Sequence, residues 1–349
     1  MTWGEPPIEG APPPRGRGLV FALGLGAVSW AWSEVGFWAH FRADDNPVVW
    51  ILTWLLYSLA AGVVVAVLRR FPVRGAASLI LVGALYGWLV EGVIAATVYL
   101  ALPLSIIWTG VAWHGLLTVC IGWYALPRVV SRGGPRAYLA CALVGIAWGL
   151  WSVSWWGAPP DDGQTAATPE LASYAIFVAI VSMAGACGYL LMHTQAPIQS
   201  LPRSPWPLRA AVAALAGWGI LNIVIPLPWA PLVLAALLAI AITALRRLSS
   251  TASDDTAVVD DRGLAVALPL GWQPGVPASS LAPFLAIPAV AIATYAALSV
   301  VAPSETGQGP FYVGFAATVA VLSVLGTGAL LWSLWQAWRH TPTHAEAEA

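Results

Sequence analysis

The chain contains no lysine, and only 9% of its 349 residues are charged. A soluble domain usually carries about 25% charged residues, so this shortage excludes an ordinary soluble enzyme and a disordered chain. All fifteen cationic residues are arginines, and a formal net charge of −1 at pH 7 offers no basic surface for nucleic acid. Of the residues, 59% are hydrophobic, and the mean hydropathy is +0.77. The composition therefore predicts an integral membrane protein that contacts the lipid bilayer and binds no nucleic acid.

Several chemical motifs are missing as well. The chain has no Walker loop, no GxSxG and no HExxH motif. Its three cysteines, Cys120, Cys141 and Cys187, lie singly in apolar runs without metal-ligand spacing. The sequence therefore identifies no cofactor, we expect no metal site, and an enzyme is not the favoured interpretation.

Long apolar runs dominate what is present. About 20 apolar residues cross a bilayer as a helix, and the chain contains ten such runs. We therefore predict an all-α polytopic membrane protein with about ten transmembrane helices. The ten runs are 18–41, 47–68, 75–101, 104–126, 137–156, 171–192, 209–225, 228–245, 281–301 and 311–337.

The arginines predict the orientation, because cytoplasmic loops carry an excess of basic residues. With ten spans, fourteen of the fifteen arginines fall on the same side as the N-terminus, and only Arg42 falls on the other. We therefore expect both termini to be cytoplasmic. The absence of lysine beside abundant alanine and glycine is typical of a GC-rich coding sequence, and we expect a multi-pass protein of a bacterial plasma (inner) membrane.

The first and fifth runs resemble each other. Each begins at an arginine, passes a Trp- and Ser-rich outer half and ends at an Asp-Asp pair, Asp44-Asp45 or Asp161-Asp162. This similarity predicts two four-helix membrane repeats, 18–132 and 133–247, in parallel orientation because four is an even number. The other predicted segments are a cytoplasmic N-terminal segment 1–17, a cytoplasmic loop 248–280, a C-terminal helix hairpin 281–338 and a disordered tail 339–349.

Only the first repeat carries ionisable residues deep inside its spans, namely Glu34, Glu91 and His114. Charge near the bilayer centre costs at least a few kcal/mol, so such residues usually face the bundle interior and mark a site. Counted from the adjacent turns at about 1.5 Å per residue, all three lie roughly 15 to 17 Å deep. We therefore expect them to form a proton or substrate site, and we assign no catalytic residue.

Six further residues are expected to support this site. Two indoles, four residues before and after Glu34, are predicted to hold its carboxylate between them. A third indole lies beside Glu91, an amide of the second repeat lies at a similar level, and two basic residues lie at the outer mouth, where Arg42 can pair with the neighbouring aspartates. The supporting candidates are Trp30, Trp38, Trp88, Asn222, His40 and Arg42.

Three functions fit this pattern. Two buried carboxylates and a histidine at one depth can exchange protons while a substrate crosses, so the favoured hypothesis is a proton-linked transporter or permease for a small molecule. One alternative is a non-catalytic assembly or lipid-binding protein, in which the polar residues only lock helices together. Another is an intramembrane hydrolase that uses Glu and His. The composition is similar to that of the glutamate-type CAAX-processing membrane proteases, but their adjacent Glu-Glu and paired histidines are missing.

Overall fold

The computed structural model describes residues 17–157, 170–193, 205–250, 278–300 and 310–339, apart from Pro72 and Arg74. Within these ranges every regular element is a helix. Nine of the described helices are long and apolar enough to cross a membrane, and a shorter apolar helix covers Leu208–Val224. The prediction of an all-α polytopic membrane protein with about ten spans is therefore confirmed. The predicted N-terminal segment, the loop 248–280 and the tail lie almost entirely outside the described residues.

Several spans combine more than one type of helix. In chain order the spans are α1 (Arg17–Ser29) with η1 (Trp30–Val35) and α2 (Gly36–Trp38); α3 (Pro47–Arg70); α4 (Ala76–Leu89) with η2 (Val90–Ile94); η4 (Ile106–Ala125) with α5 (Leu126–Arg132); α6 (Pro135–Ser154); α7 (Leu171–His193); α8 (Pro205–Gly219) with η7 (Ile220–Val224); α9 (Ala230–Ser250); α10 (Ala286–Ser299); and α11 (Pro310–Arg339). Short 3₁₀ turns add η3 (Thr97–Tyr99), η5 (Trp155–Gly157) and η9 (Ala278–Leu285).

Local sequence explains where α3 begins. The side chain of Asn46 accepts hydrogen bonds from the backbone N–H groups of Val48 and Val49, each at 3.0 Å. Pro47 occupies the first helical position, where its missing N–H leaves no bond unmade. The Asn-Pro pair thus ends the loop after the first span and starts the second.

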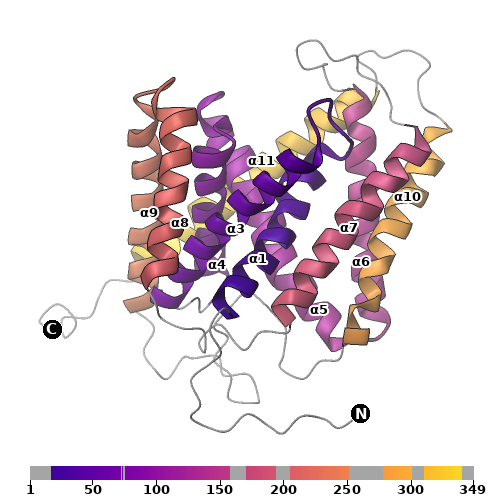
Figure 1. The fold of residues 1–349 in the computed structure, drawn as a ribbon, viewed down its shortest axis with the longest axis horizontal. Helices are drawn as coiled ribbons and strands as arrows, with labels where there is room; N and C mark the ends of the chain where they lie inside the picture. The colour runs from indigo at the N-terminus through magenta and orange to yellow at the C-terminus, as the bar shows by residue number, and fades with distance from the viewer. Residues whose placement is uncertain are drawn as a thin grey trace, which may run out of the picture.

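The first four spans form the centre of the bundle. Figure 1 shows α1, α3 and α4 between two flanking groups, with α8 and α9 on one side and α6, α7 and α10 on the other. α8 packs on α3, α9 packs on α4, and α7 packs on α1, while α11 contacts η4 and α4. The span formed by α4 and η2 is the most buried of all. Side chains on this span therefore meet protein rather than lipid.

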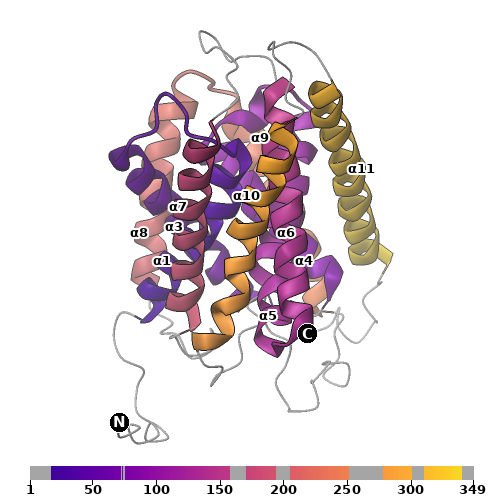
Figure 2. The same cartoon turned by 90° about the vertical axis from the view of Figure 1, so that its right-hand side faces the viewer.

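The two helix pairs of the predicted second repeat lie on opposite flanks of this centre (Figure 1). α10 lies between α6 and α7 and packs on both (Figure 2). The helices α6, α7, α8 and α9 therefore pack against the first four spans and their neighbours rather than around a centre of their own. The repeat and the terminal hairpin remain predictions from the sequence.

Arginines of several helices gather at one end of the bundle. The guanidinium groups of Arg70 and Arg246 lie 5.4 and 6.0 Å from the ring of Phe71, so the ends of α3 and α9 meet there. Arg247 lies 5.2 Å from the ring of Trp338, which brings the end of α11 to the same place. Such contacts let a cation stay at a membrane boundary while it packs on apolar surface.

Glycines bring α4 and η4 into close contact. A β-carbon added at Gly83 would lie 2.8 Å from Cα of Gly115, and one added at Gly87 would overlap the carbonyl oxygen of Gly110. The two glycines on α4 are four residues apart, whereas the two on η4 are five apart. This difference fits their helix types, because η4 is a π-helix with more residues per turn than an α-helix. The glycine contact therefore depends on the π-helical form of η4.

We expect Gly87→Ala to destabilise the protein by roughly 1–3 kcal/mol, because the added methyl group overlaps a backbone carbonyl that has no room to move. The measurement is the thermal unfolding midpoint in detergent. Gly328→Ala in α11 is the matched control, because nothing lies within 4 Å of a β-carbon there. The control should be neutral or slightly stabilising, since alanine favours helix. Equal midpoints for the two variants would contradict the proposed close contact.

Candidate functional site

All four polar candidates inside the spans lie in π-helical segments. Glu34 lies in η1, Glu91 in η2, His114 in η4 and Asn222 in η7. The backbone bonds at the ends of these segments span five residues, as in the bond from the N–H of Ala95 to the carbonyl of Val90 at 3.1 Å. Such segments are rare and are frequent at functional sites. The π-helical form is therefore a second feature, besides polarity, that distinguishes these four positions.

Glu91 and His114 form a buried pair between the third and fourth spans. Nε2 of His114 lies 2.5 Å from Oε1 of Glu91, and the two residues are only 3% and 5% exposed, respectively. The outward atoms of the pair, Oε2 of Glu91 and Nδ1 of His114, have no hydrogen-bond partner among the described residues. The pair can therefore share one proton along its short bond and still offers an acceptor or donor on each side.

Glu34 lies towards the end of the first span, beside Arg42. Its Oε2 accepts a hydrogen bond from the hydroxyl of Tyr57 at 2.9 Å, and Nη1 of Arg42 lies 3.9 Å from its Oε1. Its side chain is 26% exposed, so it is more accessible than the Glu91–His114 pair. Among the described residues, Glu34 thus has its hydrogen bond and its ion pair with Tyr57 and Arg42, and none with Glu91 or His114.

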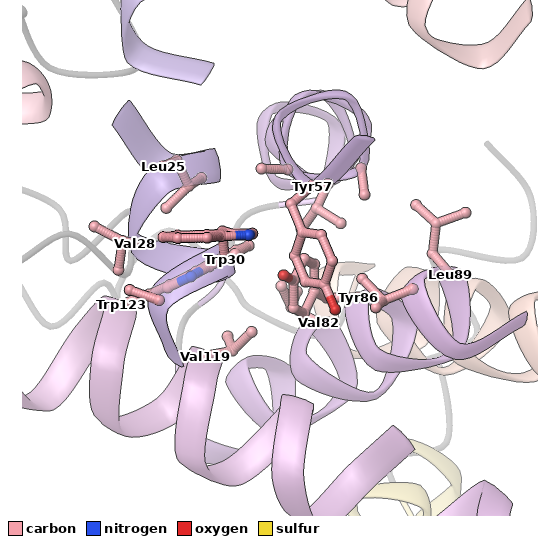
Figure 3. Close-up of a cluster of buried hydrophobic side chains, with 14 of the residues drawn as sticks. Leu25, Val28, Trp30, Tyr57, Val82, Tyr86, Leu89, Val119 and Trp123 are labelled. Atoms are coloured by element: carbon pink, nitrogen blue, oxygen red, sulfur yellow. The ribbon is translucent and has the colours of Figure 1, made fainter. Parts of the chain in front are cut away.

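Hydroxyl groups of residues near Glu34 and His114 meet in the interior. Oγ of Ser33 lies 2.9 Å from Oγ1 of Thr118 and 3.5 Å from the hydroxyl of Tyr86. The ring of Tyr86 in turn lies edge-on to the ring of His114, with centroids 6.1 Å apart. Figure 3 shows Tyr57 and Tyr86 converging in the interior beside Trp30 and Trp123. We call this group the polar cluster: Ser33, Glu34, Tyr57, Tyr86, Glu91, His114 and Thr118.

The predicted indole partners of Glu34 have other contacts. Trp30 packs edge-on against Trp50, with centroids 5.3 Å apart, and its Nε1 has no hydrogen-bond partner among the described residues. Trp38 lies under the guanidinium of Arg42, which is 4.4 Å from the ring centroid. Arg42 also bonds Asp44 at 2.8 Å. The structure therefore gives Glu34 a tyrosine and an arginine as partners in place of the two predicted indoles.

The other supporting candidates contact groups that do not belong to the polar cluster. Trp88 donates to the carbonyl of Ile106 at 3.0 Å. The ring of His40 lies edge-on to Trp155 at 6.1 Å. Asn222 is exposed, and its amide donates to the carbonyl of Trp218 at 2.9 Å. The structure does not bring Asn222 to the polar cluster.

Aromatic donors stabilise the irregular end of η2. The indole of Trp218 lies 3.5 Å from the carbonyl of Ile94, and the hydroxyl of Tyr99 donates to the carbonyl of Gly92 at 2.9 Å. Tyr99 lies in the loop after the span, where burial raises its pKa to about 12 and keeps the hydroxyl protonated as a donor. These bonds satisfy carbonyl groups that lipid cannot solvate.

A set of four tryptophans caps the end of the first span. Their indole N–H groups donate to the carbonyls of Ser33, Gly36 and Phe37 at 2.6 to 3.2 Å. The carbonyls of Gly36 and Phe37 lie in the last turn of the helix, which ends where Ala39 adopts a left-handed conformation with φ 59°, and the carbonyl of Ser33 lies in the turn before. Side-chain donors are needed there because the last carbonyls of a helix have no intrahelical partner. We call this set the tryptophan collar: Trp113, Trp148, Trp151 and Trp155.

A cavity of about 530 Å³ borders the collar, and it is lined by η1, η4, α6, α7, α10, α11 and residues beside them. No member of the polar cluster lines it. Its wall contains six aromatic residues: Trp32, Trp113, Trp148, Trp151, Tyr189 and Phe284. Sequence patterns did not predict this cavity, because its walls come from six spans, several of which are far apart along the chain.

The described residues do not assemble a metal centre. Within the described ranges, no group of three or more His, Cys, Asp or Glu side chains lies close enough to hold a metal ion. Glu34, Glu91 and His114 therefore fall short of a three-ligand site.

Comparison with known protein families, with curated proteins and with solved structures found no match. The function of this protein must therefore be inferred from the geometry of the polar cluster and of the cavity.

We expect Trp148→Phe to lower the free energy of unfolding by roughly 1–3 kcal/mol, because the carbonyl of Gly36 loses its indole donor in a water-poor site. The measurement is unfolding in detergent, followed by circular dichroism. Trp332→Phe in α11 is the control, since that side chain is 41% exposed on the bundle surface. Equal losses for both variants would show that the collar does not cap the helix.

Proposed function

We propose that this protein is a proton-linked membrane transporter or permease, and that its protons bind at the Glu91–His114 pair. The observation that carries the proposal is the 2.5 Å bond between the two side chains, with an unpartnered atom on each outer side among the described residues. A pair that served only to lock two helices would gain most from satisfying all its polar atoms, because each buried unpaired group costs free energy. The free outer atoms instead suit a group that receives and passes on a proton.

The polar cluster suggests a path for the proton. Glu34 is half-buried beside Arg42, at the end of the bundle opposite the gathered arginines. The hydroxyl of Tyr57 bonds Glu34, the hydroxyls of Ser33 and Tyr86 lie 3.5 Å apart, and the ring of Tyr86 lies edge-on to His114. Hydroxyl groups can both donate and accept, so they can relay protons between carboxylates. Glu34 is then the entry group and the buried pair is the storage site.

The arginine positions support a direction for this path. Basic residues favour the cytoplasmic side, so the mouth at Glu34 would open to the outside of a bacterial plasma membrane, with both termini in the cytoplasm. Protons driven inward by the membrane potential would reach Glu34 first. The transported substrate is proposed to be a small molecule.

The test is proton uptake into liposomes that contain the purified protein and a pH-sensitive dye, driven by a potassium diffusion potential. We expect Glu91→Gln to reduce uptake at least tenfold, because the amide keeps the shape and a hydrogen bond to His114 but cannot carry the proton. Glu34→Gln should slow uptake less, since it changes only the entry group. Glu170→Gln, at an exposed site before α7, is the matched control and should behave as the wild type.

Infrared spectroscopy makes the test independent of the substrate. If proton binding occurs at the pair, the carboxyl region of the spectrum should contain a component that is missing from Glu91→Gln, while the signal of the other acidic residues is unchanged. If the spectrum and the uptake of Glu91→Gln both equal those of the wild type, the proposal is wrong. If Glu91→Gln unfolds in detergent as readily as His114→Ala, which breaks a buried pair at a cost of about 3–5 kcal/mol, the pair is structural.

A further inference from the structure

The cavity beside the tryptophan collar has features of a ligand site. Its volume of about 530 Å³ lies within the roughly 300–1,000 Å³ that is typical of small-molecule pockets. None of the described residues that line it is charged. A charged or strongly polar molecule would therefore lose its hydration in the cavity without compensation.

The aromatic residues of the wall offer a ligand apolar ring surface rather than hydrogen-bond donors. The indole N–H groups of Trp113, Trp148 and Trp151 all donate to backbone carbonyls of the first span. The hydroxyl of Tyr189 donates to the carbonyl of Gly122 at 2.6 Å. Because their polar ends are engaged elsewhere, these side chains contribute apolar ring atoms to the cavity wall and no donor. Aromatic rings pair favourably with other rings, stacked or edge-on, so the wall favours a planar partner.

One polar group in the wall is unused. Oγ of Ser182, midway along α7, is buried and has no hydrogen-bond partner within the described part of the chain. Other serines in the spans satisfy their hydroxyls on the carbonyl four residues earlier, as Ser152, Ser323 and Ser333 do at 2.7 to 2.8 Å. The hydroxyl of Thr318, also in the wall, donates to the carbonyl of Gly314. The hydroxyl of Ser182 thus has no hydrogen bond of its own at mid-depth of the span. Its Oγ has almost no exposed surface in this rotamer, so a rotation about the Cα–Cβ bond would turn it towards a ligand in the cavity.

The cavity reaches the apolar outer surface of the bundle. Two of its lining residues, Val321 on α11 and Ile121 on η4, are 58% and 36% exposed. In a bilayer these side chains face lipid, so a ligand would enter from the hydrocarbon phase. The ligand must therefore be soluble in lipid.

We propose that this cavity binds a neutral, lipid-soluble molecule with a planar ring that bears a carbonyl oxygen. The ring would lie against the indoles, and the carbonyl would accept the hydrogen bond that Ser182 has to give. A saturated acyl chain fits less well, since it has neither a flat face for the indoles nor an acceptor at mid-depth. The proposal does not depend on proton transport, because no residue of the polar cluster lines the cavity.

The test uses a short-chain benzoquinone as the probe, added to the protein in nanodiscs of phosphatidylcholine, with tryptophan fluorescence as the readout. We expect saturable quenching for the wild type. Ser182→Ala should weaken binding roughly two- to tenfold, the effect of one lost neutral hydrogen bond. Ser323→Ala is the matched control and should bind as the wild type, since that serine does not line the cavity.

A second part of the test uses variants that fill the cavity. Ala147→Phe, or Ala186→Phe if the first variant does not fold, should abolish the saturable quenching. Quenching that rises linearly and equally in all variants would overturn the proposal, because it reports only partition into the bilayer. Quenching by brominated phosphatidylcholine that Ala147→Phe removes, without saturable quinone binding, would assign the cavity to a lipid acyl chain instead. If Ser182→Ala binds the probe with unchanged affinity, Ser182 does not bond the carbonyl of the ligand, and that part of the proposal is overturned.

Discussion

Backbone hydrogen bonding in a medium without water is the constraint on which this structure depends. Each carbonyl left free inside a bilayer costs several kcal/mol, so a span can depart from the α-helix only where a neighbour supplies a donor. In this protein the donors are largely aromatic side chains. The indoles of the tryptophan collar bond the end of the first span, and Trp218 and Tyr99 bond the end of η2. The abundance of tryptophan, 21 residues, therefore has a function beyond the aromatic belt at the membrane surface.

The same constraint explains why the polar residues lie where they do. The π-helical segments carry Glu34, Glu91 and His114, and the glycine contact between α4 and η4 brings the helices of the buried pair together. The polar cluster and the apolar cavity both adjoin η1 and η4, but they are lined by different residues. Trp113 links the two, since it lines the cavity and donates to the carbonyl of Ser33 in the polar cluster.

Much of the fold could be predicted from the sequence because hydrophobic length is a strong signal in membrane proteins. The ten runs correspond to ten helices, and the rarity of charge within them pointed to Glu91 and His114, which the structure joins. The partners of Glu34 could not be predicted. Tyr57 looks like an ordinary aromatic residue of an apolar span, and its contact requires the packing angle between α1 and α3. Asn222 matches Glu91 in its position along the span, but its side chain is exposed.

The cavity could not be predicted from the sequence for a different reason. Its walls depend on α10 lying between α6 and α7, and on α11 crossing η4. Neither contact joins spans that are consecutive in the chain. Patterns along one helix say which face is apolar, but they do not say which distant helix covers it.

The π-helical segments also bear on how the protein can change during evolution. Each segment has more residues per turn than the α-helix that it interrupts. Removing one residue between Gly110 and Gly115 would leave these glycines four residues apart, which suits an α-helix and not a π-helix. If that part of η4 stayed π-helical, the two glycines would no longer face α4 together. Substitutions on the lipid-facing surface leave this register intact, so the length of each span is more tightly constrained than most of its side chains.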